Sequence, residues 1–139
     1  MMKVNFEIED NYALIFNGRR VDLHNNFDFA GYNFMIDRRQ LKLNWTKSSG
    51  DWISENEMPK LSLVHLEVSF INIQYKSEQE HPADEKCLSD LSFFPSSARE
   101  MNDSIVCQRN PEDGDDLIYI FQTGTLIRIG CAETILVVE

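Results

Sequence analysis

Histidine and cysteine are the residue types in this chain that could bind a metal or supply a nucleophile. Four of them could in principle share a metal ion: His24, His65, His81 and Cys87. Metal ligands usually occur in closely spaced pairs such as Cys-x-x-Cys, and the sequence contains no such pair. We expect His65, between two apolar neighbours, to point away from the core. The spacing therefore predicts structural or surface histidines, with no bound metal and no cofactor.

A cysteine–histidine pair is also available for nucleophilic catalysis, because the order of the two residues in the chain does not matter. The chain has six glycines, and none of them builds a Gly-x-Ser-x-Gly turn or a phosphate-binding loop. The three cysteines, Cys87, Cys107 and Cys131, are odd in number and unequally spaced, which predicts thiols instead of a disulfide framework. The sequence thus favours a protein that is not an enzyme.

The acidic run from Asn110 to Asp116 could supply several oxygen ligands for calcium from one short segment. A calcium loop needs the order Asp-x-Asp-x-Asp-Gly, which is absent here. The twelfth position counted from Asn110 is Phe121, where such a loop has a bidentate glutamate. We interpret the run as a solvated acidic turn without a metal.

Acidic residues are concentrated in the second half of the chain. The formal net charge is −10; residues 1–60 carry nine acids against eight Lys/Arg, and residues 61–139 carry fourteen against five. Two segments hold much of this excess: Glu78, Glu80, Asp84 and Glu85 in the first, and Glu112, Asp113, Asp115 and Asp116 in the second. A negative field repels a phosphate backbone, so we expect no nucleic-acid binding. The same field attracts a basic protein and speeds its approach.

The elements that must position these side chains alternate apolar and polar residues with a period of two. From Tyr32 to Trp45 the alternation predicts two strands joined by a turn at residues 37–40. Asn17-Gly18 predicts a second hairpin, with Leu14 opposite Val21. We also expect a four-residue turn at residues 47–50 that would place Trp45 opposite Trp52.

Later segments extend the pattern. The phase of the alternation slips twice between Leu61 and Tyr75, which predicts a bent strand, or two strands, turning a corner between sheets; a helix is the alternative. Thr123-Gly124 predicts a tight hairpin that is apolar on both faces and therefore covered on both sides. One face would carry Ile118, Ile120, Ile127 and Ile129, and the other Leu117, Tyr119, Phe121 and Leu126. Residues 104–108 are expected to form a short strand, and residues 135–138 a buried one.

Together these segments predict a single all-β domain over residues 1–139. We expect an antiparallel β-sandwich or flattened barrel of about 9–10 strands, with one or two short helical turns between residues 76 and 116. No apolar run reaches the roughly 18 residues of a membrane span. The N-terminus lacks the basic region and apolar block of a secretory signal, so the expected location is cytoplasmic.

Two functions of different class fit this sequence. The first is a non-catalytic acidic protein-binding module, of the inhibitor or immunity type, whose two acidic segments contact and neutralise a basic partner. The alternative is a β-barrel that holds a small molecule in a cavity lined by Tyr32, Phe34, Trp45 and Trp52. An exposed strand edge or a surplus aromatic face could also support a homo-oligomer.

Overall fold

The computed structural model describes residues 1–75, 86–102 and 104–139, and it is an all-β sandwich that does not close into a barrel. The chain forms these elements in order: β1 (Lys3–Val4), β2 (Glu7–Glu9), β3 (Ala13–Phe16), β4 (Arg19–Asp22), β5 (Phe27–Met35), η1 (Ile36–Arg38), β6 (Gln40–Lys47), β7 (Lys60–Leu66), β8 (Phe70–Gln74), β9 (Leu88–Pro95), η3 (Ser96–Ala98), β10 (Asp115–Phe121), β11 (Leu126–Gly130) and β12 (Glu133–Val138). η1 and η3 are single turns of 3-10 helix. The all-β fold class is therefore confirmed.

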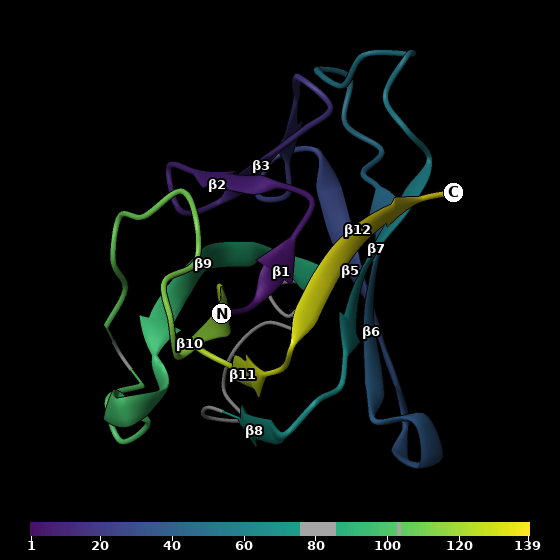
Figure 1. Cartoon of the computed structure of the whole chain (residues 1–139). Helices are drawn as coiled ribbons and strands as arrows, with labels where there is room; N and C mark the ends of the chain where they lie inside the picture. Colours follow the sequence, from purple (N-terminus) through teal and green to yellow (C-terminus); the bar gives the residue numbers. More distant parts are fainter. Residues whose placement is uncertain (76–85, 103) are drawn as a thin grey trace.

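The strands make three sheets (Figure 1). A five-stranded sheet has the order β1-β12-β7-β6-β5, and a four-stranded sheet has the order β8-β11-β10-β9. The third sheet, β2-β3-β4, is seen at the top of Figure 1. All strand pairs are antiparallel except β1 with β12.

Both hairpins expected in the first third of the chain are present. β3 and β4 meet at Asn17-Gly18, where both residues have positive φ (51° and 74°), as a two-residue hairpin loop requires. Leu14 pairs with Val21, which confirms the predicted register. The alternation from Tyr32 to Trp45 forms β5 and β6 around η1, although β5 begins five residues earlier, at Phe27.

The phase slips between residues 61 and 75 mark a corner between sheets. β7 belongs to the five-stranded sheet and β8 to the four-stranded sheet, so the chain changes sheets at residues 67–69. Glu67 has a φ of 52°, a left-handed conformation that an extended strand does not contain. The prediction of two strands around a corner is confirmed, and the helix alternative is wrong.

The hairpin at Thr123-Gly124 is present, but its predicted faces are wrong. The amide of Phe121 donates to the carbonyl of Thr125, so the loop holds three residues instead of two and Gly124 takes a φ of 88°. One extra loop residue shifts the register by one. The resulting pairs are Leu117 with Ile129, Ile118 with Arg128, Tyr119 with Ile127, and Ile120 with Leu126.

Two further expectations are wrong. Trp45 lies opposite Phe29 and Leu61 instead of Trp52, because residues 48–59 form a long loop and not a hairpin turn. Residues 104–108 carry no strand. They pass over the outer face of the four-stranded sheet, where the Ser92 hydroxyl accepts a hydrogen bond from the amide of Val106 at 3.0 Å.

One hydrophobic cluster with residues from all three sheets fills the interior. Its largest fully buried side chains include Trp45, Tyr119, Phe27 and Phe93. A smaller cluster on the outer face of the four-stranded sheet contains Phe94, Ile118 and Leu126, with Ala98 and Val106 packed on it. The central hairpin β10–β11 is therefore covered on both faces, as the sequence predicts.

Within residues 1–75, 86–102 and 104–139, no helix is long and apolar enough to cross a bilayer.

Candidate functional site

A pocket of about 570 Å³ lies where the β4–β5 connection, the start of β5 and the segment after β6 meet. We call it the Trp52 pocket. Its walls combine a carboxylate, an imidazole, hydroxyls and one exposed indole, and they comprise His24, Asn25, Asp28, Ser48, Ser49, Gly50, Trp52 and Cys87. The carboxylate and the hydroxyls can accept hydrogen bonds from a ligand, and the indole can stack against a flat part of the same ligand.

Trp52 is exposed and yet fixed in position. The side chain is 69% exposed, and its indole Nε1–H donates to the carbonyl oxygen of Asn25 at 3.1 Å. The ring lies directly over Gly50 and occupies the space that a Cβ atom on that residue would need. An aromatic side chain with few remaining rotamers loses little entropy when it binds a partner.

The loop of residues 48–59, named here the Trp52 loop, is tied to the body of the protein at both ends. At its start, the amide of Ser48 donates to the carbonyl of Asn26 at 2.9 Å. Near its end, the buried Glu57 carboxylate contacts Arg19 at 2.9 Å and accepts a hydrogen bond from Asn26 at 3.3 Å. The backbone that carries Trp52 is therefore held independently of the indole.

Asp28 supplies the carboxylate of the pocket. Its Oδ1 accepts a hydrogen bond from the Ser48 hydroxyl at 2.8 Å, which fixes the rotamer of the acid. The side chain is half-buried at the beginning of β5, where it pairs across the sheet with Thr46. Asp28 lines the pocket and makes no ion pair with any described residue, so no described cation neutralises its carboxylate.

His24 and Cys87 lie on one wall of the Trp52 pocket. The Cys87 Sγ is 3.5 Å from His24 Nδ1, while the same nitrogen is 2.7 Å from the carbonyl oxygen of Leu88. A carbonyl only accepts hydrogen bonds, so we assign the proton to Nδ1. That nitrogen cannot take a proton from the thiol, and this geometry does not favour a cysteine–histidine nucleophile pair.

Gly50→Ala is expected to displace the Trp52 ring without unfolding the protein. The new methyl group would overlap the indole, and the backbone of Gly50 does not have the positive φ that strains alanine. The indole N–H resonance of Trp52 should move toward the chemical shift of a solvent-exposed indole. The quenching of Trp52 fluorescence by solvent should increase. Ser49→Ala is the matched control and should change neither signal; an unmoved indole in Gly50→Ala would contradict the packing described here.

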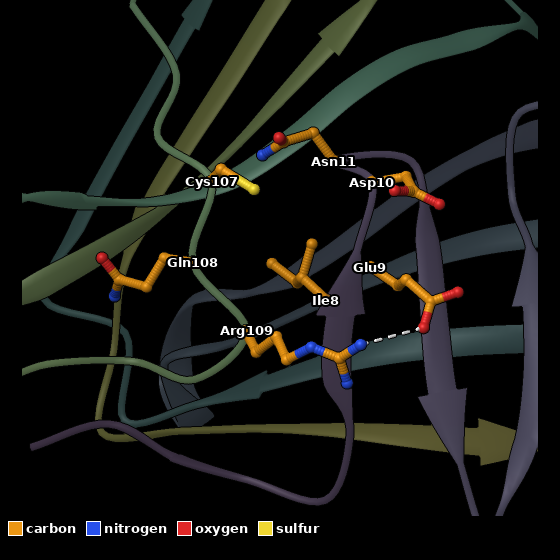
Figure 2. A pocket seen from close by; sticks show the side chains of 7 residues that line it. All are labelled: Ile8, Glu9, Asp10, Asn11, Cys107, Gln108 and Arg109. Atoms are coloured by element: carbon orange, nitrogen blue, oxygen red, sulfur yellow. Dashed lines mark hydrogen bonds and ion pairs between the residues drawn. The ribbon is translucent and has the colours of Figure 1, made fainter.

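A second pocket, of about 190 Å³, lies between residues 8–11 and residues 107–109, and it is lined by Ile8, Glu9, Asp10, Asn11, Cys107, Gln108 and Arg109 (Figure 2). Its charged groups are paired: Arg109 is 3.3 Å from Glu9, and Arg20 on the neighbouring strand β4 contacts both Glu9 and Asp10. The Asn11 amide donates to two backbone carbonyls. These contacts hold the β2–β3 turn against residues 106–109, which is a structural role.

The first predicted acidic segment, Glu78, Glu80, Asp84 and Glu85, lies outside the described residues. In the second, Glu112 and Asp113 are exposed, and Asp113 is 3.0 Å from the N-terminal amine. The other two acids are buried, contrary to the expectation of a solvated turn. Asp115 accepts hydrogen bonds from the amide of Glu112 and from Gln108, at 2.8 and 2.7 Å.

Asp116 is 1% exposed and lies on the outer face of the four-stranded sheet between two arginines. Arg99 donates to it twice and Arg128 once, each at 2.9 Å. The hydrogen bonds to Asp116 raise the pKa of Arg99. Because Arg128 is fully buried, Asp116 serves as its internal counter-charge and cannot meet a partner.

The structure does not bring the four predicted pocket aromatics together. Trp45 is buried in the core against Phe29 and Tyr119, and its Nε1 has no hydrogen-bond partner among the described residues. Tyr32 lines an apolar pocket of about 190 Å³, which is below the roughly 300 Å³ of ordinary ligand pockets. Phe34 lines another pocket beside η1, and Trp52 belongs to the pocket described above. A single aromatic-lined barrel cavity is therefore absent from the described part of the chain.

His65 points into the core instead of away from it. It shares a face of the sheet with the core residue Leu41, and it is fully buried. Its Nδ1 is 2.9 Å from the Leu41 carbonyl oxygen, and its Nε2 is 2.8 Å from the Tyr119 hydroxyl. Among the described residues, no group of three or more His, Cys, Asp or Glu side chains is placed to hold a metal ion.

The residues that sequence reasoning missed are Asp28 and Ser48. They are 20 residues apart, and nothing in either local pattern distinguishes them from other polar strand ends. Only the pairing of β5 with β6 places them side by side. No protein-family model, no curated protein and no solved structure matches this chain. A function must therefore be inferred from the geometry of the chain itself.

Proposed function

We propose that this protein is a non-catalytic acidic module that binds a basic protein, of the inhibitor or immunity type, through the Trp52 loop and the pocket beside it. The observation that carries the proposal is Trp52, which is 69% exposed although its indole is hydrogen-bonded and packed on Gly50. Tryptophan is among the residues most enriched in the energetic centres of protein interfaces. The hydrogen bond and the contact with Gly50 hold the indole in place, and the exposed part of the ring is available to a partner.

The charge of the chain supports a basic partner. The formal net charge is −10, and a field of this size raises the association rate with a positively charged protein. The Trp52 loop carries two exposed acids, Asp51 and Glu55, and contains no Lys or Arg; its third acid, Glu57, is buried and paired with Arg19. An apolar anchor with exposed acids in the same loop suits a surface whose apolar centre is bordered by Lys and Arg.

Trp52→Ala is expected to weaken binding of such a partner by at least about thirtyfold, since truncating a central interface tryptophan costs about 2 kcal/mol or more. The immobilised wild-type chain would be exposed at low salt to lysate of its source cell, and bound protein eluted with salt. A basic protein that elutes in equal stoichiometry would then be purified and titrated against each variant. Its affinity for the wild type should fall as salt rises.

Ile36→Ala is the matched control, because Ile36 is at least as exposed as Trp52 (77% against 69%) but lies on η1, outside the residues that line the Trp52 pocket. The control should bind the purified partner like the wild type. Equal affinities for Trp52→Ala and Ile36→Ala, or a purified partner with no basic surface, would overturn the proposal.

A further inference from the structure

We infer that the Trp52 pocket receives an arginine side chain. This inference rests on the proposed function, because it names the chemical group by which the basic partner is recognised. A guanidinium group needs three things from a site: a carboxylate, hydrogen-bond acceptors and a flat surface on which to stack. The described residues that line the Trp52 pocket supply all three.

Asp28 supplies the carboxylate. It is a lining residue, it is fixed by the Ser48 hydroxyl at 2.8 Å, and it makes no ion pair with a described residue. Only one of its oxygens is engaged by this hydrogen bond, so the other can accept from a guanidinium N–H. A charge-assisted hydrogen bond is about twice as strong as a neutral one.

Trp52 supplies the flat surface. One part of its ring covers Gly50, and the remainder is open to solvent. Cations are attracted to the face of an indole, and tryptophan is the strongest side chain for this contact. Because the indole N–H is already bonded to the Asn25 carbonyl, the ring cannot rotate away without losing that bond.

The remaining walls favour a donor-rich ligand. The Ser49 hydroxyl can accept a hydrogen bond, and among the described residues no Lys or Arg lines the pocket to repel a cation. An anion is disfavoured by Asp28 and by the neighbouring Asp51. Arginine is favoured over lysine because its planar group can bond to the carboxylate and stack on the indole at the same time.

The inference is tested with N-acetyl-arginine amide as the probe and the intact protein as the receptor. The chain has two tryptophans, and Trp45 is buried, so the indole N–H resonance of Trp52 reports on the pocket alone. We expect a saturable shift of this resonance with arginine, a weaker one with the lysine analogue and none with the norleucine analogue. Asp28→Asn should weaken arginine binding about tenfold, as expected for loss of a hydrogen bond between charged groups.

Asp37→Asn is the matched control, because it removes an acid on η1, outside the lining of the Trp52 pocket, and should leave the titration unchanged. No shift with arginine, equal shifts with norleucine, or equal effects of Asp28→Asn and Asp37→Asn would overturn the inference. The two proposals fail separately. If Trp52→Ala weakens binding of the purified basic partner but the arginine probe does not bind, only the assignment of the pocket to arginine is refuted. Arginine binding together with a partner indifferent to Trp52 would refute only the proposed interface.

Discussion

Replacing Asp116 with alanine is expected to lower the free energy of unfolding by about 3–5 kcal/mol, because it leaves the buried Arg128 without its counter-charge. The carbonyl oxygens of Pro95, Ala98 and Met101 also accept hydrogen bonds from Arg128, but none of them carries a full charge. The loss would be measured as the difference between urea unfolding curves of wild type and variant.

Two variants separate this charge effect from simple truncation. Glu112→Ala removes an exposed acid from the same acidic segment as Asp116 and should change the free energy of unfolding by less than about 0.5 kcal/mol. The double variant Asp116→Leu with Arg128→Met removes both buried charges together and should lose less than Asp116→Ala alone. If Asp116→Ala matched Glu112→Ala, the buried arginine would not depend on this carboxylate.

The stability of the protein is expected to fall by about 3 kcal/mol between pH 6.5 and pH 4 because of His65 alone. Burial lowers the pKa of His65 from 6.5 to about 4 in the folded protein. Below pH 6.5 the unfolded chain binds a proton at this histidine and the folded chain does not, so acid favours unfolding. Below about pH 4 both states are protonated, and this contribution stops changing.

The measurement is the free energy of unfolding at several pH values for wild type and His65→Gln. The variant loses stability at pH 7, because the Leu41 carbonyl and the Tyr119 hydroxyl lose their imidazole partner. Between pH 6.5 and 4 the stability of the variant should nevertheless depend less steeply on pH. The carboxylates that titrate in this range contribute equally to both proteins, and only the wild type has the contribution of His65. Parallel curves would show that His65 is not neutral in the fold.

Period-two alternation is enough to predict the strands because it depends only on which face each residue occupies. The hairpin at Asn17-Gly18 has the predicted register since that dipeptide selects one loop length. Thr123-Gly124 does not select between two- and three-residue loops, and one residue reverses the faces of β11. That reversal also places Arg128 on the same outer face as Ile118 and Asp116.

The candidate site is less accessible to prediction. Trp52 can be named from the sequence, but its contacts come from Asn25 and Gly50, which only the folded loop brings to it. The acids at 115 and 116 are indistinguishable in sequence from the exposed acids at 112 and 113. What distinguishes Asp116 is that two arginines, Arg99 just after η3 and Arg128 on β11, lie against it only after the sheet has formed.

The place of β12 in the five-stranded sheet has a consequence for how the chain is made. β12 lies between β1 and β7, and the Asn5 side chain bonds both the carbonyl and the amide of Leu136, at 3.1 and 2.7 Å. During synthesis from the N-terminus, β7 therefore waits with one edge unpaired until residues 133–138 have left the ribosome. Until then the unpaired edge of β7 and its Leu61 and Leu63 are open to other nascent chains, so crowded translation exposes this fold to aggregation.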